Sequence, residues 1–124
     1  MHEMGLAMAI YDTCRAAVAR QGPGRLEWVR VAVGELAAVE PDLLRFAWEA
    51  LTAEGPDAGS VLEVEWRPAE QRCPACGDVA ERAPGSWLRL CPACGSPLRV
   101  EGGDDLDVLR LSFMPYDDEG GESE

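Results

Sequence analysis

The sequence contains Cys73-Pro74-Ala75-Cys76-Gly77 and then Cys91-Pro92-Ala93-Cys94-Gly95, two nearly identical knuckles in a C-x2-C-x14-C-x2-C arrangement. Each pair of cysteines forms a tight turn whose two thiolates face one ion, and the glycine that follows tolerates the sharp turn. Two such turns complete a tetrahedral site for zinc. The spacing therefore predicts a structural zinc site with the ligands Cys73, Cys76, Cys91 and Cys94.

Other roles for the cysteines explain this pattern less well. A thioredoxin-like redox centre needs one such motif at the start of a helix rather than two copies. A catalytic zinc needs an open position for water or substrate, which four thiolates do not leave. The fifth cysteine, Cys14, is predicted to be a small core residue, with a metal or redox role as the alternative.

The segment that carries the knuckles differs from the rest of the chain. Residues 68–97 hold five of the nine prolines and show little apolar periodicity, so we expect a zinc ribbon over 68–104. Between the knuckles, a turn at Pro84-Gly85 and the apolar pair Trp87-Leu88 predict a small hairpin. Such a module is too small to fold by hydrophobic burial alone, and zinc binding supplies on the order of 10 kcal/mol in comparable peptides.

Two amphipathic helices are expected outside the ribbon. Residues 4–20 have an apolar face that stops before the breakers Gly22-Pro23-Gly24. A second helix starts at Pro41 and stops before Gly55-Pro56. The residues expected on the buried faces are Leu6, Ile10, Cys14 and Ala17 in the first helix and Leu44, Ala47, Trp48 and Leu51 in the second.

Three segments alternate in the manner of strands, over residues 26–33, 61–67 and 106–113. We expect Leu109, Leu111 and Phe113 to be aligned on one face of the last strand. The four tryptophans and Phe46 are expected to be core or half-buried packing residues rather than a cofactor-binding set. The predicted fold class is α+β, a small three-stranded sheet covered by two helices and interrupted by the ribbon. The domains would be residues 1–67 plus 105–114 and residues 68–104, followed by a disordered acidic tail over 115–124.

Charge and hydropathy narrow the function. The chain of 124 residues has 23 acidic against 11 basic residues and a net charge of -12, which disfavours nucleic acid as a partner. Nothing approaches the roughly 18 consecutive apolar residues of a membrane span, and the N-terminus lacks the basic region of a signal peptide. We therefore expect a cytoplasmic protein, in which paired cysteines bind metal rather than form disulfides.

The single histidine, His2, places imidazole chemistry at the N-terminus. The α-amine, the first main-chain amides and this imidazole together form a nitrogen-rich set suited to square-planar Ni(II) or Cu(II). An ordinary exposed terminus is the alternative interpretation.

The chain resembles the HypA/HybF nickel metallochaperones, which help to mature [NiFe] hydrogenases and, in some bacteria, urease. The resemblance rests on Met1-His2-Glu3 before a helix, on the two knuckles before a last strand, and on the stretch between them. In that stretch the matching residues are Val33-Gly34-Glu35-Leu36, Glu40-Pro41 and Arg45-Phe46-Ala47.

The resemblance implies a protein with two metals: zinc held by the four cysteines, and transported nickel held around Met1, His2 and Glu3. It also implies two partners, a HypB-type nickel GTPase and a hydrogenase large-subunit precursor, with a urease accessory protein and a homodimer as further candidates. Glu3 or Glu40 could orient His2, although both also suit the start of a helix, where negative charge is favourable. Some relatives carry histidines near the zinc loop, and this chain has none there.

Three other classes of function are alternatives to a nickel carrier. A zinc-ribbon adaptor for protein recognition is the strongest alternative, and it requires nothing of His2. A nucleic-acid-binding ribbon conflicts with the acidic balance of the chain. An enzyme is not expected, because the sequence has no second histidine, no nucleophile beside a base and no phosphate-binding loop.

Overall fold

The computed structural model describes residues 3–83 and 85–116. It contains helices α1 (Glu3–Ala19) and α2 (Pro41–Thr52), a 3-10 helix η1 (Glu35–Ala37), and strands β1 (Gly24–Gly34), β2 (Val61–Arg67), β3 (Glu70–Arg72), β4 (Val79–Ala80), β5 (Arg99–Glu101) and β6 (Leu106–Pro115). The two helices match the predicted ranges to within a few residues at each end. The predicted α+β fold with a four-cysteine insert is confirmed.

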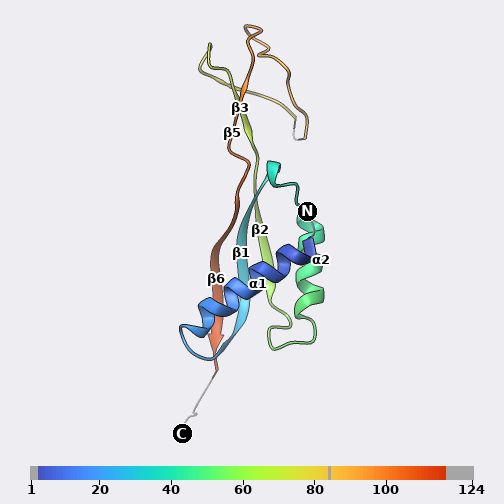
Figure 1. Cartoon of the computed structure of the whole chain (residues 1–124), viewed down its shortest axis with the longest axis vertical. Coiled ribbons are helices and arrows are strands. Elements are labelled where there is room, and N and C mark those ends of the chain that lie inside the picture. The colour runs from blue at the N-terminus through green and yellow to red at the C-terminus, as the bar shows by residue number, and fades with distance from the viewer. Residues whose placement is uncertain (1–2, 84, 117–124) are drawn as a thin grey trace.

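Two small sheets follow each other along the long axis of an elongated molecule (Figure 1). The larger sheet has the order β2-β1-β6, in which β1 pairs parallel with β2 and antiparallel with β6. The smaller sheet has the order β4-β3-β5 and belongs to the ribbon. Strand β2 leads directly into β3, and β5 leads back into β6, so two nearly continuous strands carry the chain to the ribbon and return it.

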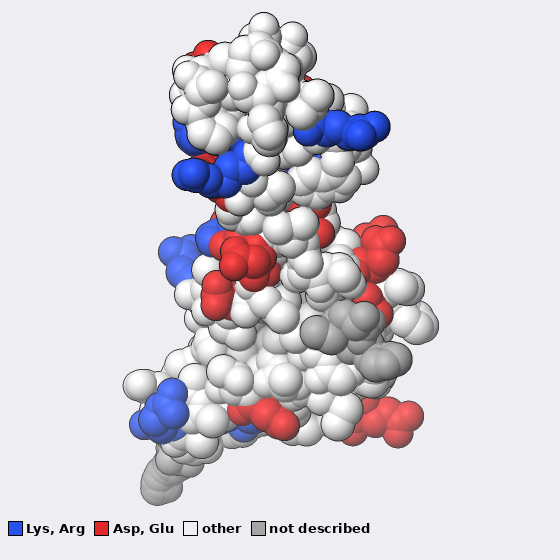
Figure 2. All heavy atoms as spheres, turned by 45° about the horizontal axis from the view of Figure 1, so that its top comes forward, with Lys and Arg blue, Asp and Glu red and all other residues white. Residues whose placement is uncertain are grey.

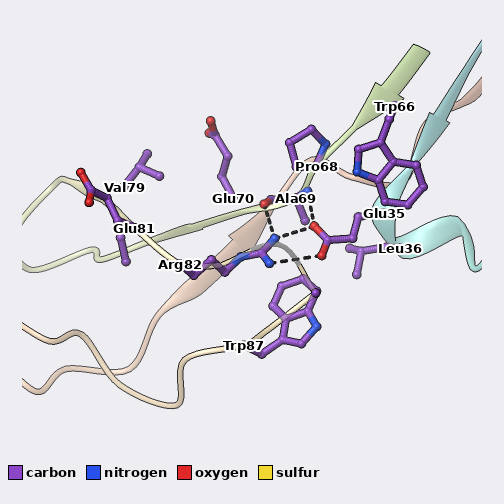
Figure 3. Close-up of a pocket in the computed structure, with 12 residues that line it drawn as sticks. Glu35, Leu36, Trp66, Pro68, Ala69, Glu70, Val79, Glu81, Arg82 and Trp87 are labelled. Carbon is purple, nitrogen blue, oxygen red and sulfur yellow. Dashed lines mark hydrogen bonds and ion pairs between the residues drawn. The ribbon is translucent and has the colours of Figure 1, made fainter. Parts of the chain in front are cut away.

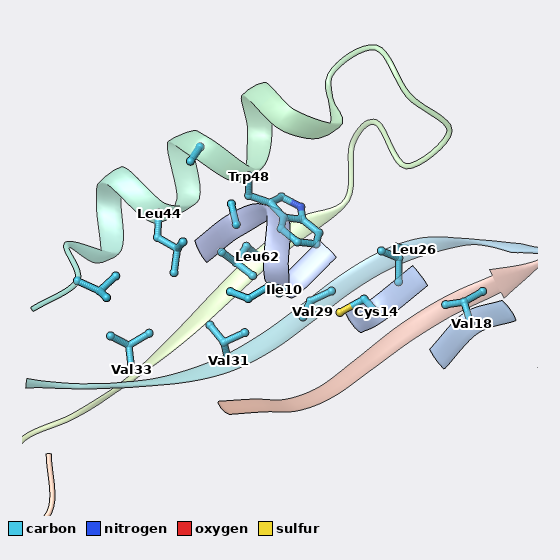
Figure 4. Packing of buried hydrophobic residues seen from close by; sticks show 13 residues of the cluster. Ile10, Cys14, Val18, Leu26, Val29, Val31, Val33, Leu44, Trp48 and Leu62 are labelled. Atoms are coloured by element: carbon cyan, nitrogen blue, oxygen red, sulfur yellow. The ribbon is translucent and has the colours of Figure 1, made fainter. Parts of the chain in front are cut away.

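Both helices cover the same face of the larger sheet. Side chains of α1 and α2 meet the valines of β1 in one cluster (Figure 4), which includes Ile10, Cys14, Val29, Val31, Val33, Leu44, Trp48 and Leu62. Burying a side chain of this size contributes about 1.5–3 kcal/mol. The opposite face is more polar, and Arg30 pairs there across the sheet with Glu63 at 3.0 Å.

Strand β6 departs from the predicted alternation. Its register against β1 shifts between Arg110 and Val108, which leaves Leu109 in a bulge. As a result Val108, not Leu109, packs against the core together with Leu111 and Phe113. The expectation that Leu109 shares their face is wrong, because a bulge changes which side chains face inward.

One aromatic residue is far less buried than expected. Trp48 is fully buried, and Trp66 and Trp87 are half-buried, 45% and 43% exposed, within the expectation, but Phe46 is 69% exposed. The prediction that Phe46 packs in or beside the core is therefore wrong. Phe46 lies on the face of α2 opposite to Leu44, Ala47 and Trp48, which point to the sheet.

The predicted pairing of strands between the knuckles is not found in the described residues 79–83 and 85–90. A turn is present, because the N–H of Ser86 donates to the carbonyl of Ala83 at 3.0 Å, and Pro84 of the predicted turn lies outside the described residues. Within the described part of the ribbon, Val79–Ala80 pairs back onto β3, around the first knuckle, and Leu90 bridges to Pro97 around the second. Each knuckle thus forms the turn of its own short hairpin. The chain between them is held to β3 by Gln71, whose side chain hydrogen-bonds to both the N–H and the C=O of Leu88.

Candidate functional site

The four predicted zinc ligands come together at the end of the ribbon. The sulfur atoms of Cys73, Cys76, Cys91 and Cys94 all lie within 4.8 Å of one another. The Sγ atoms of Cys73 and Cys94 are 3.5 Å apart, and those of Cys76 and Cys91 are 4.0 Å apart. A tetrahedral zinc with Zn–S bonds of 2.3 Å requires sulfur atoms about 3.8 Å apart, so the cluster fits this ion.

Main-chain hydrogen bonds shape both knuckles in the same way. The N–H of Gly77 donates to the carbonyl of Cys73 at 2.7 Å, and the N–H of Gly95 donates to that of Cys91 at 2.8 Å. Both glycines have positive φ angles, 81° and 78°. A side chain at either position would be strained, which explains why each Cys-x-x-Cys is followed by glycine.

Hydrogen bonds around the knuckles shift the pKa values of two of the thiols in opposite directions. The hydroxyl of Ser96 lies 3.3 Å from the sulfur of Cys94, and hydrogen bonds from Ser96 lower the pKa of that thiol to about 6. Hydrogen bonding with Cys94 and its neighbours raises the pKa of Cys76 to about 12. Because a cysteine ligand must be a thiolate, binding of a zinc ion by all four cysteines would release protons.

Arg72 ties the first knuckle to the ribbon sheet. Its guanidinium donates to the carbonyl of Gly77 at 2.9 Å and pairs with Glu101 of β5 at 3.0 Å. The first knuckle is thereby connected to the strand that leads back toward the larger sheet.

Of the predicted nickel ligands, Met1 and His2 lie outside the described residues, whereas Glu3 begins α1. The carboxylate of Glu3 accepts a hydrogen bond from the main-chain N–H of Glu40 at 3.1 Å. Glu40 is the residue before α2, so the first turns of both helices meet here. The structure thus brings the carboxylate of Glu3 to the main chain of Glu40, 37 positions away in the sequence.

Cys14 lies away from the cysteine cluster, on the buried face of α1. Burial raises the pKa of its thiol to about 11. A neutral, fully buried thiol is a poor nucleophile and a poor metal ligand, so its role as a core residue is confirmed.

Sequence reasoning missed the junction between the larger sheet and the ribbon. Glu35 of η1 forms a two-point ion pair with Arg82 of the ribbon, with N–O distances of 2.5 and 3.1 Å, and both side chains are nearly buried. Arg82 also donates to the carbonyl of Ala69 at 2.7 Å, and its guanidinium lies 4.1 Å from the ring centre of Trp87. No local pattern indicates a pairing between residues 47 positions apart.

A groove of about 1020 Å³ opens beside this ion pair (Figure 3). We call it the junction groove, and it is lined by Glu35, Leu36, Trp66, Pro68, Ala69, Glu70, Val79, Ala80, Glu81, Arg82, Gly85 and Trp87. Its walls come from the larger sheet with η1, from the connection between β2 and β3, and from the ribbon. It is a second candidate site, separate from the cysteine cluster.

Comparison with known proteins places this architecture among metal-handling proteins. Residues 1–113 match the family model described as "Hydrogenase/urease nickel incorporation, metallochaperone, hypA". The hydrogenase maturation factor HypA of Alkalilimnicola ehrlichii is 38% identical over 112 residues, which cover 90% of this chain and 97% of that protein. For the HypA of Chlorobium limicola the identity is 38% over 77 residues, or 62% of this chain and 66% of that protein.

Two solution structures share the fold. The Ni metallochaperone HypA from Helicobacter pylori superposes with a TM-score of 0.60 at 20% identity, covering 94% of this chain and all of that chain. A second HypA structure gives a TM-score of 0.61 at 22% identity, covering 94% of this chain and 98% of that chain. The overall fold is thus common to all three proteins.

Proposed function

We propose that this chain, which belongs to the HypA family of hydrogenase/urease nickel-incorporation metallochaperones, carries Ni(II) at its N-terminus. It delivers this nickel to a [NiFe] hydrogenase precursor. Urease is the second candidate recipient. The family match over residues 1–113 carries this proposal, because it includes the N-terminal Met1-His2-Glu3, both helices and the four cysteines.

The proposed nickel ligands are Met1, through its α-amine, His2 and Glu3. Amine and imidazole nitrogen are ligands that Ni(II) favours, and main-chain amides can join them by losing a proton. The hydrogen bond from Glu40 to Glu3 supports the proposal, because it holds the carboxylate at the place where α1 begins. The α-amine can act as a ligand only if Met1 is the first residue of the mature protein, and intact-mass measurement checks this.

Replacing the histidine tests the nickel site. His2→Ala should abolish uptake of about one nickel per chain, measured by isothermal titration into zinc-loaded, untagged protein, because it removes the chain's only imidazole. Zinc content and the circular dichroism spectrum should not change. Native uptake should strengthen as pH rises past about 6.5 and then past about 7.7–8.0, where imidazole and α-amine lose their protons.

Met8→Ala is the matched control, since Met8 is half exposed on α1 and is not a proposed ligand. It should bind nickel as the native protein does. Equal nickel uptake by the native protein and His2→Ala would instead favour the zinc-ribbon adaptor. One observation supports that second candidate, because the junction groove offers a surface for recognition that needs no nickel.

The proposed role of zinc at Cys73, Cys76, Cys91 and Cys94 is structural. Four thiolates would close the coordination sphere and hold the two knuckles together. Removing zinc with a chelator should therefore unfold residues 68–104 while residues 1–67 and 105–114 keep their helices, because the latter have their own core. Amide NMR spectra recorded before and after chelation would check this division, and loss of dispersion throughout the spectrum would contradict it.

The proposed partners are a HypB-type nickel GTPase and the hydrogenase large-subunit precursor, with a urease accessory protein and self-association as further candidates. We place these encounters in the cytoplasm. In the described part of the chain, neither helix is long and apolar enough to cross a bilayer. Co-elution of the purified chain with each purified partner in size-exclusion chromatography would test the assignments one by one.

A further inference from the structure

The junction groove has an apolar surface that is open to solvent. Four of its lining side chains are large, apolar and only partly covered: Leu36 is 47% exposed, Trp66 45%, Trp87 43% and Val79 40%. They come from η1, β2 and the ribbon, so no single element creates this surface. Clustered exposed apolar side chains of this kind mark interaction sites more often than isolated ones do.

The charged residues that line the groove have an excess of negative charge. Glu35 and Arg82 neutralise each other, and Arg82 is further engaged by the carbonyls of Ala69 and Ser86. The two remaining charged residues of the lining, Glu70 and Glu81, are both acidic and exposed. Figure 3 shows their carboxylates away from the ion pair. A ligand thus meets apolar side chains bordered by negative charge.

The stacking of Arg82 on Trp87 indicates which chemistry suits these rings. A guanidinium already lies 4.1 Å from the centre of the Trp87 ring, in the geometry of a cation–π contact. Aromatic rings beside carboxylates favour arginine or lysine side chains, whose stems are apolar and whose ends are positive.

We propose that the junction groove docks a basic segment of a partner protein, with its apolar side chains against Leu36, Trp66 and Trp87 and its lysine or arginine side chains near Glu70 and Glu81. Residues 117–124 of the chain itself contain five acidic residues and no basic one, so charge disfavours them as the occupant. A second copy is disfavoured for the same reason, because each chain has a net charge of -12. Acidic side chains are also prominent below the ribbon in Figure 2.

This proposal goes beyond nickel carriage and does not depend on it. It requires an intact groove, in which Glu35 and Arg82 form an ion pair between two of its walls, and it requires nothing of His2. Peptide binding that persists in His2→Ala, whatever happens to nickel uptake, would separate the two proposals.

The test uses the zinc-loaded full chain and a display library of random short peptides. Peptides enriched on the native protein should combine apolar residues with lysine or arginine, and their binding should change the fluorescence of Trp66 and Trp87. Replacing the two exposed groove carboxylates, Glu70→Lys with Glu81→Lys, should weaken the binding of the best peptide by about tenfold or more, because two attractions become repulsions. Trp87→Ala should weaken it by about tenfold, as expected for a central aromatic contact.

The matched control is Asp12→Lys with Glu54→Lys, which changes the net charge equally at exposed positions outside the groove. This control double variant should reduce the affinity for the peptide much less than the double variant of Glu70 and Glu81 in the groove. Equal losses of affinity in the two double variants, enrichment of acidic peptides, or no effect of Trp87→Ala would overturn the proposal. A dimer in sedimentation that the groove pair dissociates would identify a second copy as the occupant and would also overturn it.

Discussion

At the scale of single residues, Asp57 is a fully buried carboxylate that joins α1 to β1. It accepts hydrogen bonds from the hydroxyl of Tyr11 at 2.5 Å and from the N–H of Leu26 at 2.8 Å, and it pairs with Arg15 at 3.3 Å. The pKa of Tyr11 is raised to about 12, mainly by burial and secondly by its hydrogen bond to Asp57. Asp57→Ala should lower the free energy of unfolding by about 2–4 kcal/mol in urea titrations, because it leaves buried donors unpaired. Tyr11→Phe, which removes one donor and keeps the carboxylate, should cost less, and an equal or larger loss would contradict this account.

At the scale of elements, the close crossing of β1 with the chain before β6 depends on Gly34. A Cβ atom at this position would lie 2.1 Å from the carbonyl oxygen of Gly103, a main-chain atom that cannot turn aside. Gly34→Ala should therefore lower the free energy of unfolding by about 1–3 kcal/mol or more. The control is Gly5→Ala in α1, which has nothing within 4 Å and should be neutral or stabilising. Thermal unfolding of both variants measures this difference in stability. Equal melting temperatures would show that the main chain around Gly103 can move to accommodate a side chain at position 34.

At the scale of the whole molecule, the pair between Glu35 and Arg82 joins the larger sheet to the ribbon. The hydrogen bond from Arg82 holds the pKa of Glu35 below its ordinary value of 4.5. The stabilisation is thus fully present above pH 4.5 and is lost as the pH falls through the lower pKa of the folded protein. The difference in melting temperature between the native protein and Glu35→Gln should shrink as the pH is lowered. The control is Glu54→Gln, on an exposed turn, which should show no such trend. A difference that grows on acidification would contradict the assignment.

Local sequence signals predicted most of the elements and half of the candidate site. Pro41 suits the first turn of a helix, and α2 begins there. The alternation over residues 61–67 coincides with β2. Glu3 and the four cysteines were also candidates from the sequence, since metal ligands follow from residue type and spacing.

The remaining features could not be predicted because they depend on contacts between distant segments. The bulge at Leu109 arises from the register of β6 against β1, which alternation within one strand does not reveal. Phe46 is an apolar residue on the outward face of α2, and its type alone suggested burial. The pairing of Glu35 with Arg82 is one of many possible pairings between acidic residues and arginines.

The sequence by itself determined the α+β class, the two helices, the insert with its four clustered cysteines, and the family, because each follows from local spacing or from the order of short motifs. Only the tertiary structure decided the order β2-β1-β6, the meeting of Glu3 with Glu40, and the junction groove. The physical reason is the sequence separation of the residues that are in contact. A knuckle or a helix is specified within a few residues, whereas a groove lined by residues 35 to 87 exists only after the sheet has brought its walls together.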